Sequence, residues 1–159
     1  MNGGAIYHLF RKLDIMTKFT PLHVQGMPDQ LRQQEIERQL QGITAKRPST
    51  RKELYRRLCI VRQYILENFH RNIQLDELSR EAALSKYHLL RTYKEAFGAT
   101  PYRQVLDLRL GASKALLADG YTIEDIAFRL GFSDRRSFTK SFKKAFGVAP
   151  SVLRERMGR

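Results

Sequence analysis

Hydrophobic residues recur every three or four positions through most of this chain, the spacing that places them on one face of an α-helix. Glycine, proline and short polar clusters interrupt the pattern and mark the connections between helices. The expected fold class is therefore all-α. The helices that the pattern predicts cover residues 6–16, 29–40, 51–69, 75–83, 85–97, 101–118, 122–131, 134–147 and 151–157.

The clearest pattern lies in residues 122–147, where two short helices flank a glycine. Thr122 is a favourable N-cap, and Asp125 three positions later completes a start that is similar to a capping box. Gly131 provides the backbone freedom that a sharp turn requires. A helix, a glycine turn and a second helix form the unit that places its second helix in the major groove of DNA.

The second helix of this pair has an apolar side and a basic side. Ser133 or Asp134 can cap its N-terminus, and Gly147 ends it. The side expected to be buried consists of Phe138, Phe142, Ala145 and Phe146. The opposite side consists of Arg135, Arg136, Thr139, Lys140, Lys143 and Lys144. This separation predicts a helix that is anchored by aromatic residues and exposes cations.

The same pattern occurs earlier in the chain, so the sequence contains an internal repeat. An offset of 49 residues aligns Lys94, Ala96, Phe97, Gly98 and Pro101 with Lys143, Ala145, Phe146, Gly147 and Pro150, and the core residues Leu89 and Tyr93 with Phe138 and Phe142. Upstream of the turn the offset falls to 48, so the second copy has one extra residue in its turn. Two copies with equivalent cores and different exposed residues are expected to read two different short DNA sequences.

The helix over residues 101–118 is expected to connect the two copies, with Thr100 as its N-cap. If it spaces them by about 34 Å, one turn of duplex, a single chain can enter two successive major grooves. Arg109 is expected to pair with a helix end or a carboxylate rather than with DNA. The apolar residues assigned to this helix are Tyr102, Val105, Leu106, Leu110, Leu116 and Leu117.

The chain is strongly basic, with a formal net charge of +13 among 159 residues, which indicates a polyanionic partner. Residues 51–159 carry 22 Lys or Arg against 12 Asp or Glu, so most of the excess lies in this part. Cys59 is the only cysteine, and the four histidines have no metal-ligand spacing, so no metal or other cofactor is expected. Without a long apolar run or a signal-peptide pattern, the expected location is the cytoplasm, at the nucleoid and not in a membrane.

The first 50 residues are expected to form a helical appendage, followed by a domain over residues 51–159. Residues 43–50 are basic, contain Pro48, and are the expected connector between the two. The helix over residues 29–40 has a thin apolar stripe, which suits either a solvated spacer or half of a weak dimer contact. The expected oligomeric state is a monomer, or a weak dimer formed through residues 1–50.

Residues 54–157 resemble the DNA-binding domain of the AraC/XylS family of bacterial transcription regulators. The resemblance is carried by SKYHLLRTYKEAFGATPYRQV in the first copy, LRLGASKALLAD in the linker and IEDIAFRLGFSDRRSFTKSFKKAFGVAPSVLR in the second copy. It implies two helix-turn-helix subdomains joined by a long linker helix. It also implies sequence-specific binding to promoter or operator DNA in adjacent major grooves, and activation of transcription beside RNA polymerase.

Matching positions to the family predicts which side chains meet DNA. The residues expected at the bases are Tyr87, Leu90 and Arg91 in the first recognition helix, and Arg135, Arg136, Thr139 and Lys140 in the second. Lys143 and Lys144, farther from the N-terminus of their helix, are expected near phosphates. His88 is either a phosphate contact or an exposed structural histidine.

The chain departs from the family pattern at two positions of the first copy. Ala83 stands at the turn where glycine is common, and a positive φ there would strain it by about 1 kcal/mol or more. Leu90 occupies a base-facing position where hydrogen-bonding residues are usual, and it suits a thymine methyl group or a backbone-positioning role. The first copy is therefore expected to discriminate less.

Two alternatives remain open from the sequence. Family members usually carry a sensing and dimerising domain of well over a hundred residues, so this chain is either a short regulator or a fragment that retains the last helices of such a domain. The alternative function is a basic helical protein that coats nucleic acid nonspecifically or binds structured RNA. An enzyme is not expected, because no phosphate-binding glycine loop, paired carboxylates or activated nucleophile is present.

Overall fold

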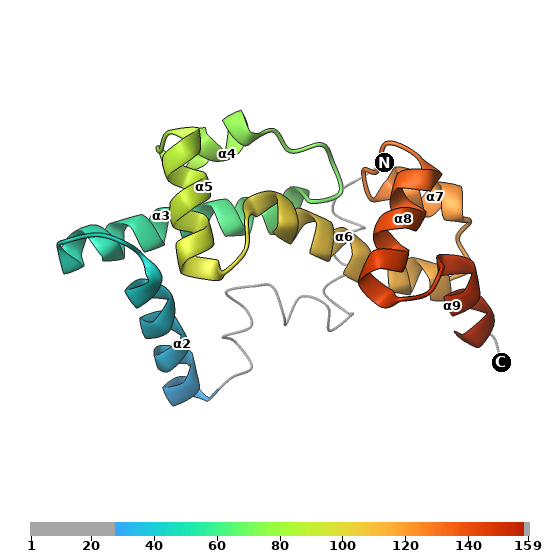
Figure 1. The fold of residues 1–159 in the computed structure, drawn as a ribbon, viewed down its shortest axis with the longest axis horizontal. Helices are drawn as coiled ribbons and strands as arrows, with labels where there is room; N and C mark the ends of the chain where they lie inside the picture. Colours follow the sequence, from blue (N-terminus) through green and yellow to red (C-terminus); the bar gives the residue numbers. More distant parts are fainter. Residues whose placement is uncertain (1–27, 158–159) are drawn as a thin grey trace. The chain divides into compact units, whose positions relative to one another are not determined.

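The computed structural model describes residues 28–157, so the helix predicted over residues 6–16 lies outside the described part. Every regular element in residues 28–157 is an α-helix, which confirms the all-α class (Figure 1). The helices are α2 (Asp29–Gly42), α3 (Pro48–Asn68), α4 (Leu75–Ala82), α5 (Lys86–Phe97), α6 (Pro101–Ala118), α7 (Ile123–Arg129), α8 (Arg135–Phe146) and α9 (Pro150–Met157).

The described chain divides into two compact units. One contains α2 to α5 and the first turn of α6, and the other contains residues 69–72, the rest of α6 and α7 to α9. In the first unit, α3 packs against α4 and α5, and α2 packs against both α3 and α5. The fully buried side chains at the centre of this unit include Leu58, Val61, Ile65, Leu89 and Tyr93.

The second unit is built around the phenylalanines of α8, which packs against α7 and α9 (Figure 1). Phe138 and Phe142 are completely buried, and their ring centroids lie 5.6 Å apart. Phe132 and Phe146 extend this row at either end, with centroid distances of 5.2 and 4.6 Å. The predicted aromatic anchor of the second recognition helix is thus confirmed.

The helix ends follow the predicted caps. The side chain of Thr122 accepts a hydrogen bond from the backbone N of Asp125 at 3.1 Å and starts α7. Of the two candidate caps of α8, Asp134 is the one used, and it accepts from the backbone N of Ser137 at 2.7 Å. Gly147 ends α8 with a φ of +76°, a conformation that glycine adopts without strain.

Two residues predicted on apolar faces are exposed instead. Tyr102 is 74% exposed, because the first turn of α6 directs Gln104 inward, where it accepts a hydrogen bond from the hydroxyl of buried Tyr93. Ala145 is exposed although its repeat partner Ala96 is buried, because α2 covers Ala96 and the described part of the second unit has no equivalent helix.

The segment 43–50 differs in part from the connector that the sequence predicts. Its last three residues form the first turn of α3, which begins at Pro48. Ile43 is only 2% exposed, and α2 packs on α3 and α5 rather than standing free. The division into an appendage of residues 1–50 and a domain of residues 51–159 stays a prediction.

Candidate nucleic-acid interface

The two helix-turn-helix copies match element by element. The first helices start 48 residues apart, and the second helices, α5 and α8, start and end 49 residues apart. In each copy the turn contains one residue in the left-handed region, Ala83 with φ +49° and Gly131 with φ +72°. Because these two are 48 residues apart and the caps Ser85 and Asp134 are 49 apart, the extra residue lies between Gly131 and Asp134.

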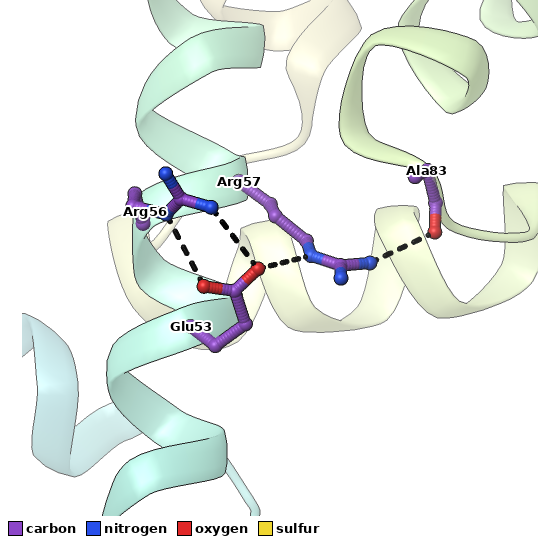
Figure 2. A network of polar contacts seen from close by, with 4 residues as sticks. All are labelled: Glu53, Arg56, Arg57 and Ala83. Atoms are coloured by element: carbon purple, nitrogen blue, oxygen red, sulfur yellow. Dashed lines mark hydrogen bonds and ion pairs between the residues drawn. The ribbon is translucent and has the colours of Figure 1, made fainter.

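An arginine from the preceding long helix holds the first turn. Arg57 of α3 donates from Nη1 to the carbonyl oxygen of Ala83 at 3.2 Å (Figure 2). Glu53 orients this arginine by accepting from its Nε at 2.8 Å, and it also accepts from Arg56. The contact stabilises a left-handed conformation that costs an alanine about 1 kcal/mol or more.

Arg109 of α6 has the corresponding role in the second copy. Its guanidinium donates to the carbonyl oxygens of Phe69, Arg71 and Gly131 at 2.7, 2.8 and 2.7 Å. Phe69 directly follows the end of α3, so the prediction that Arg109 pairs with a helix end is confirmed. One of these charge-assisted hydrogen bonds reaches the second turn at Gly131, and the other two connect the same guanidinium to the segment that follows α3.

The first recognition helix, α5, exposes a mixed surface. Ser85 caps it by accepting from the backbone N of His88 at 3.3 Å, and His88 is exposed. Tyr87 is 76% exposed and Leu90 is 36% exposed, although both are large and apolar. Arg91 is exposed on the same helix. These are the residues that the sequence assigns to DNA in the first copy.

The second recognition helix, α8, exposes a cationic surface opposite its buried phenylalanines. Five basic side chains of this surface are exposed, and Thr139, which lies on the same side of the helix, is half-buried. The exposed cations are Arg135, Arg136, Lys140, Lys143 and Lys144. Lys143 and Lys144 lie in the last turn, where the helix dipole favours positive charge. The α8 surface carries more charge than that of α5.

Each copy contains an ion pair that joins its first helix to the start of its recognition helix. Lys86 Nζ lies 2.6 Å from Asp76 Oδ1, and Arg135 Nη1 lies 2.9 Å from Glu124 Oε1. The acidic partners are 48 residues apart and the basic partners 49 apart, so the pairs occupy equivalent positions. Sequence reasoning missed both acids, although the repeat aligns them. Exposed pairs of this kind contribute little stability, but they orient the cation.

The predicted DNA-facing cations therefore fall into two groups. Arg91 and Arg135 each have an acidic partner, Glu95 and Glu124 respectively. Within residues 28–157, Arg136, Lys140, Lys143 and Lys144 form no ion pair and present their charges to solvent. The second group attracts a polyanion more strongly, because no neighbouring carboxylate in residues 28–157 offsets its charges.

Residues 28–157 contain no group of three His, Cys, Asp or Glu side chains arranged to hold a metal ion. None of the helices α2 to α9 has the length and apolar character needed to cross a bilayer. Burial raises the pKa of the Cys59 thiol, which disfavours the reactive thiolate.

Known proteins share this arrangement. A family model described as a helix-turn-helix domain matches residues 78–156. The probable transcription factor PqrA of Proteus vulgaris is 38% identical over 84 residues, which cover 52% of this chain and 69% of PqrA. The transcriptional activator RhaS of Escherichia coli is 31% identical over 100 residues, which cover 62% of this chain and 36% of RhaS. This chain thus spans only about a third of RhaS.

The fold is also similar to solved structures. The C-terminal domain of AraT, a response regulator from Geobacillus stearothermophilus, is 28% identical and has a TM-score of 0.61. The match covers 65% of this chain and 87% of that domain.

Proposed function

Because the chain belongs to the AraC/XylS family of DNA-binding transcription regulators, we propose that it recognises a specific double-stranded DNA site through α5 and α8 in adjacent major grooves. The observation that carries the proposal is the exposed face of α8, where four cations without an ion-pair partner in residues 28–157 lie opposite the buried Phe138 and Phe142. A rigid helix with such a face suits insertion into a groove lined by phosphates.

The residues of α8 have different roles in this proposal. Arg136 and Lys140 lie in the first half of the helix and donate hydrogen bonds to base edges, guanine in particular. Lys143 and Lys144 lie in the last turn and contact phosphates, which positions the helix without reading sequence. Arg135 and Thr139 complete the base-facing set.

The residues of α5 read less of the sequence. Tyr87 and Leu90 present apolar surface, which suits the methyl group of thymine, and His88 contacts a phosphate. Arg91 is the one cation of this set that donates to a base edge. The first half of the site is therefore recognised with less discrimination than the second.

The regulatory outcome that we propose is activation of transcription beside RNA polymerase, without catalysis. It is supported by RhaS, whose name identifies it as a transcriptional activator. We further propose a cytoplasmic location at the nucleoid, and a monomer or a weak dimer formed through residues 1–50. These residues are proposed to be the last part of a sensing or dimerising domain.

Selection of bound duplexes from a random pool tests this function. The expected result is one preferred site of about two helical turns, which footprinting then shows as a single protected region that resists excess random DNA. Uniform protection that disappears with modest salt would instead identify a nonspecific nucleic-acid coat. Preferential binding to structured RNA in the same competition would also contradict the proposal.

A further inference from the structure

The side chain of Glu95 connects the N-terminal helix α2 to a DNA-facing residue of α5. Its Oε1 accepts from Arg91 Nε at 2.9 Å, and its Oε2 accepts from the backbone N of Thr44 at 3.1 Å. Thr44 lies two residues beyond the end of α2. The Glu95 side chain is 22% exposed, whereas that of Arg91 is 53% exposed. One carboxylate thus joins the backbone that follows α2 to an accessible guanidinium of α5.

The end of α2 is seated directly on the backbone of α5 at this point. A Cβ added at Gly42 would overlap with the carbonyl oxygen of Glu95 and would lie 3.9 Å from the Cα of Ala96. Ile43, the next residue, is 2% exposed. Only glycine permits this close approach of α2 to α5. Because Thr44 follows Gly42 by two residues, the position of the end of α2 determines where the Thr44 backbone meets Glu95.

Hydrogen bonds also stabilise α2 in this position from the α3 side. The hydroxyl of Tyr55 donates to Oε1 of Gln39 at 2.8 Å, and Nε2 of Gln39 donates to Glu35 at 2.5 Å. Burial acts to raise the pKa of Glu95, but the hydrogen bonds from Thr44 and Arg91 outweigh it and lower the pKa. Glu95 is therefore charged at neutral pH, as both contacts require.

The second copy lacks this connection. The residue equivalent to Glu95 is Lys144, which is exposed, and the residue equivalent to Arg91 is Lys140, which forms no ion pair in the described part of the chain. Ala96 is 4% exposed, whereas its equivalent Ala145 is exposed. Within residues 28–157, a contact with the end of α2 is thus built into α5 and not into α8.

We infer that Glu95 is a positioning residue for Arg91, and that the docking of α2 on α5 tunes base discrimination in the half of the DNA site read by α5. A segment that moves α2 would alter the reading of that half while the half read by α8 keeps its preference. This inference rests on the proposed function, because it requires two separately read half-sites.

The test compares full-length variants by selection from a random duplex pool, scored separately for the two halves. For Glu95→Gln we expect discrimination at the base read by Arg91 to fall roughly three- to tenfold, with the other half unchanged. Gly42→Ala is expected to give the same half-specific loss, because it displaces the end of α2. Glu37→Gln removes the same charge from an exposed position of α2 and serves as the matched control, with no expected change.

A double-mutant cycle separates positioning from a general effect on folding. In the Arg91→Ala background, Glu95→Gln should cause no further loss of discrimination, because its effect passes through the guanidinium. Equal losses in both halves, or unchanged preferences for Glu95→Gln in a protein whose melting temperature is retained, would overturn the inference. Selection of a two-part site by the wild type, with no response to Glu95→Gln, would refute only this inference. No selected site for the wild type would refute the proposed function as well.

Discussion

Single buried aromatic residues determine how firmly each recognition helix is held. Phe142 contacts Phe138 and Phe146 in the row of rings under α8 and is completely buried. Phe128, on α7, is 86% exposed. The two phenylalanines have the same side chain but differ in the apolar surface that they remove from water, so they form a natural comparison.

Phe142→Ala is expected to lower the free energy of unfolding by about 3 to 5 kcal/mol, because the lost side chain leaves a cavity beneath α8. Urea denaturation followed by circular dichroism measures this change. Phe128→Ala is the control and should change the stability by about 0.5 kcal/mol or less. An unchanged unfolding midpoint for Phe142→Ala would contradict the packing described for α8.

The two turn residues in the left-handed region should respond to substitution in opposite directions. Ala83→Gly is expected to stabilise the protein by about 1 kcal/mol, since glycine adopts φ +49° without strain. Gly131→Ala should destabilise it, because the added Cβ would lie 2.7 Å from the carbonyl oxygen of His70. The melting temperatures of the two variants, measured by thermal unfolding, test both expectations. A lower melting temperature for Ala83→Gly would show that the first turn carries no strain.

At the scale of elements, the exposed face of α8 is where DNA specificity is expected. Arg136→Ala or Lys140→Ala should cost about 1 to 3 kcal/mol of binding free energy on the selected site and far less on random duplex. Titration of labelled duplexes measures both values, with Glu37→Ala as a surface control on another helix. Equal losses on the two duplexes would mean that these residues contact phosphates only.

The contact between α2 and α5 gives the protein a defined response to acid. The folded-state pKa of Glu95 lies below its ordinary value of 4.5, so its contribution to stability is present above about pH 4.5. That contribution is lost as the pH falls through the folded-state pKa. The pKa values of Glu35 and Glu53 are also lowered, by hydrogen bonds from Arg38 and Arg57 first, and they act in the same direction.

Unfolding midpoints in urea should therefore decrease in two stages between pH 7 and pH 3. The first decrease begins near pH 6.5, because burial lowers the pKa of His70, and the second begins near pH 4.5, where the three carboxylates titrate. Glu95→Gln should decrease less steeply than the wild type, because it lacks one of the titrating carboxylates. A Glu95→Gln curve that runs parallel to the wild-type curve would show that Glu95 does not contribute to this response.

At the scale of the whole molecule, the net charge of +13 provides attraction to DNA that does not depend on sequence. Release of counterions makes this attraction salt-dependent, with the logarithm of affinity falling by roughly 0.9 per phosphate contact for each tenfold rise in salt. The cations of α8 are the clearest contributors, because those of its last turn have no acidic partner in residues 28–157.

The double variant Lys143→Ala and Lys144→Ala should reduce the salt slope on random duplex by about 2, one unit for each phosphate contact. Its base preferences in the selection experiment should be unchanged, since phosphate contacts carry no sequence information. Fluorescence anisotropy at several salt concentrations measures the slope. An unchanged slope would place these lysines outside the interface.

The amino-acid sequence by itself determined the class, the repeat and each helix of residues 28–157, because these depend on local patterns. The periodicity of apolar residues, the caps at Thr122 and Asp134, and the offsets of 48 and 49 residues are all readable along the chain. The exposed side of each recognition helix follows too, since it lies opposite the buried side.

Only the tertiary structure decided which neighbours each exposed residue has. The pairing of Arg135 with Glu124 and the contact of Thr44 with Glu95 join residues 11 and 51 positions apart, and no local pattern encodes such pairs. The different exposure of Ala96 and Ala145 arises in the same way, because their local sequences match and α2 covers only the first. Burial depends on what packs against a helix face, and that is a property of the folded chain.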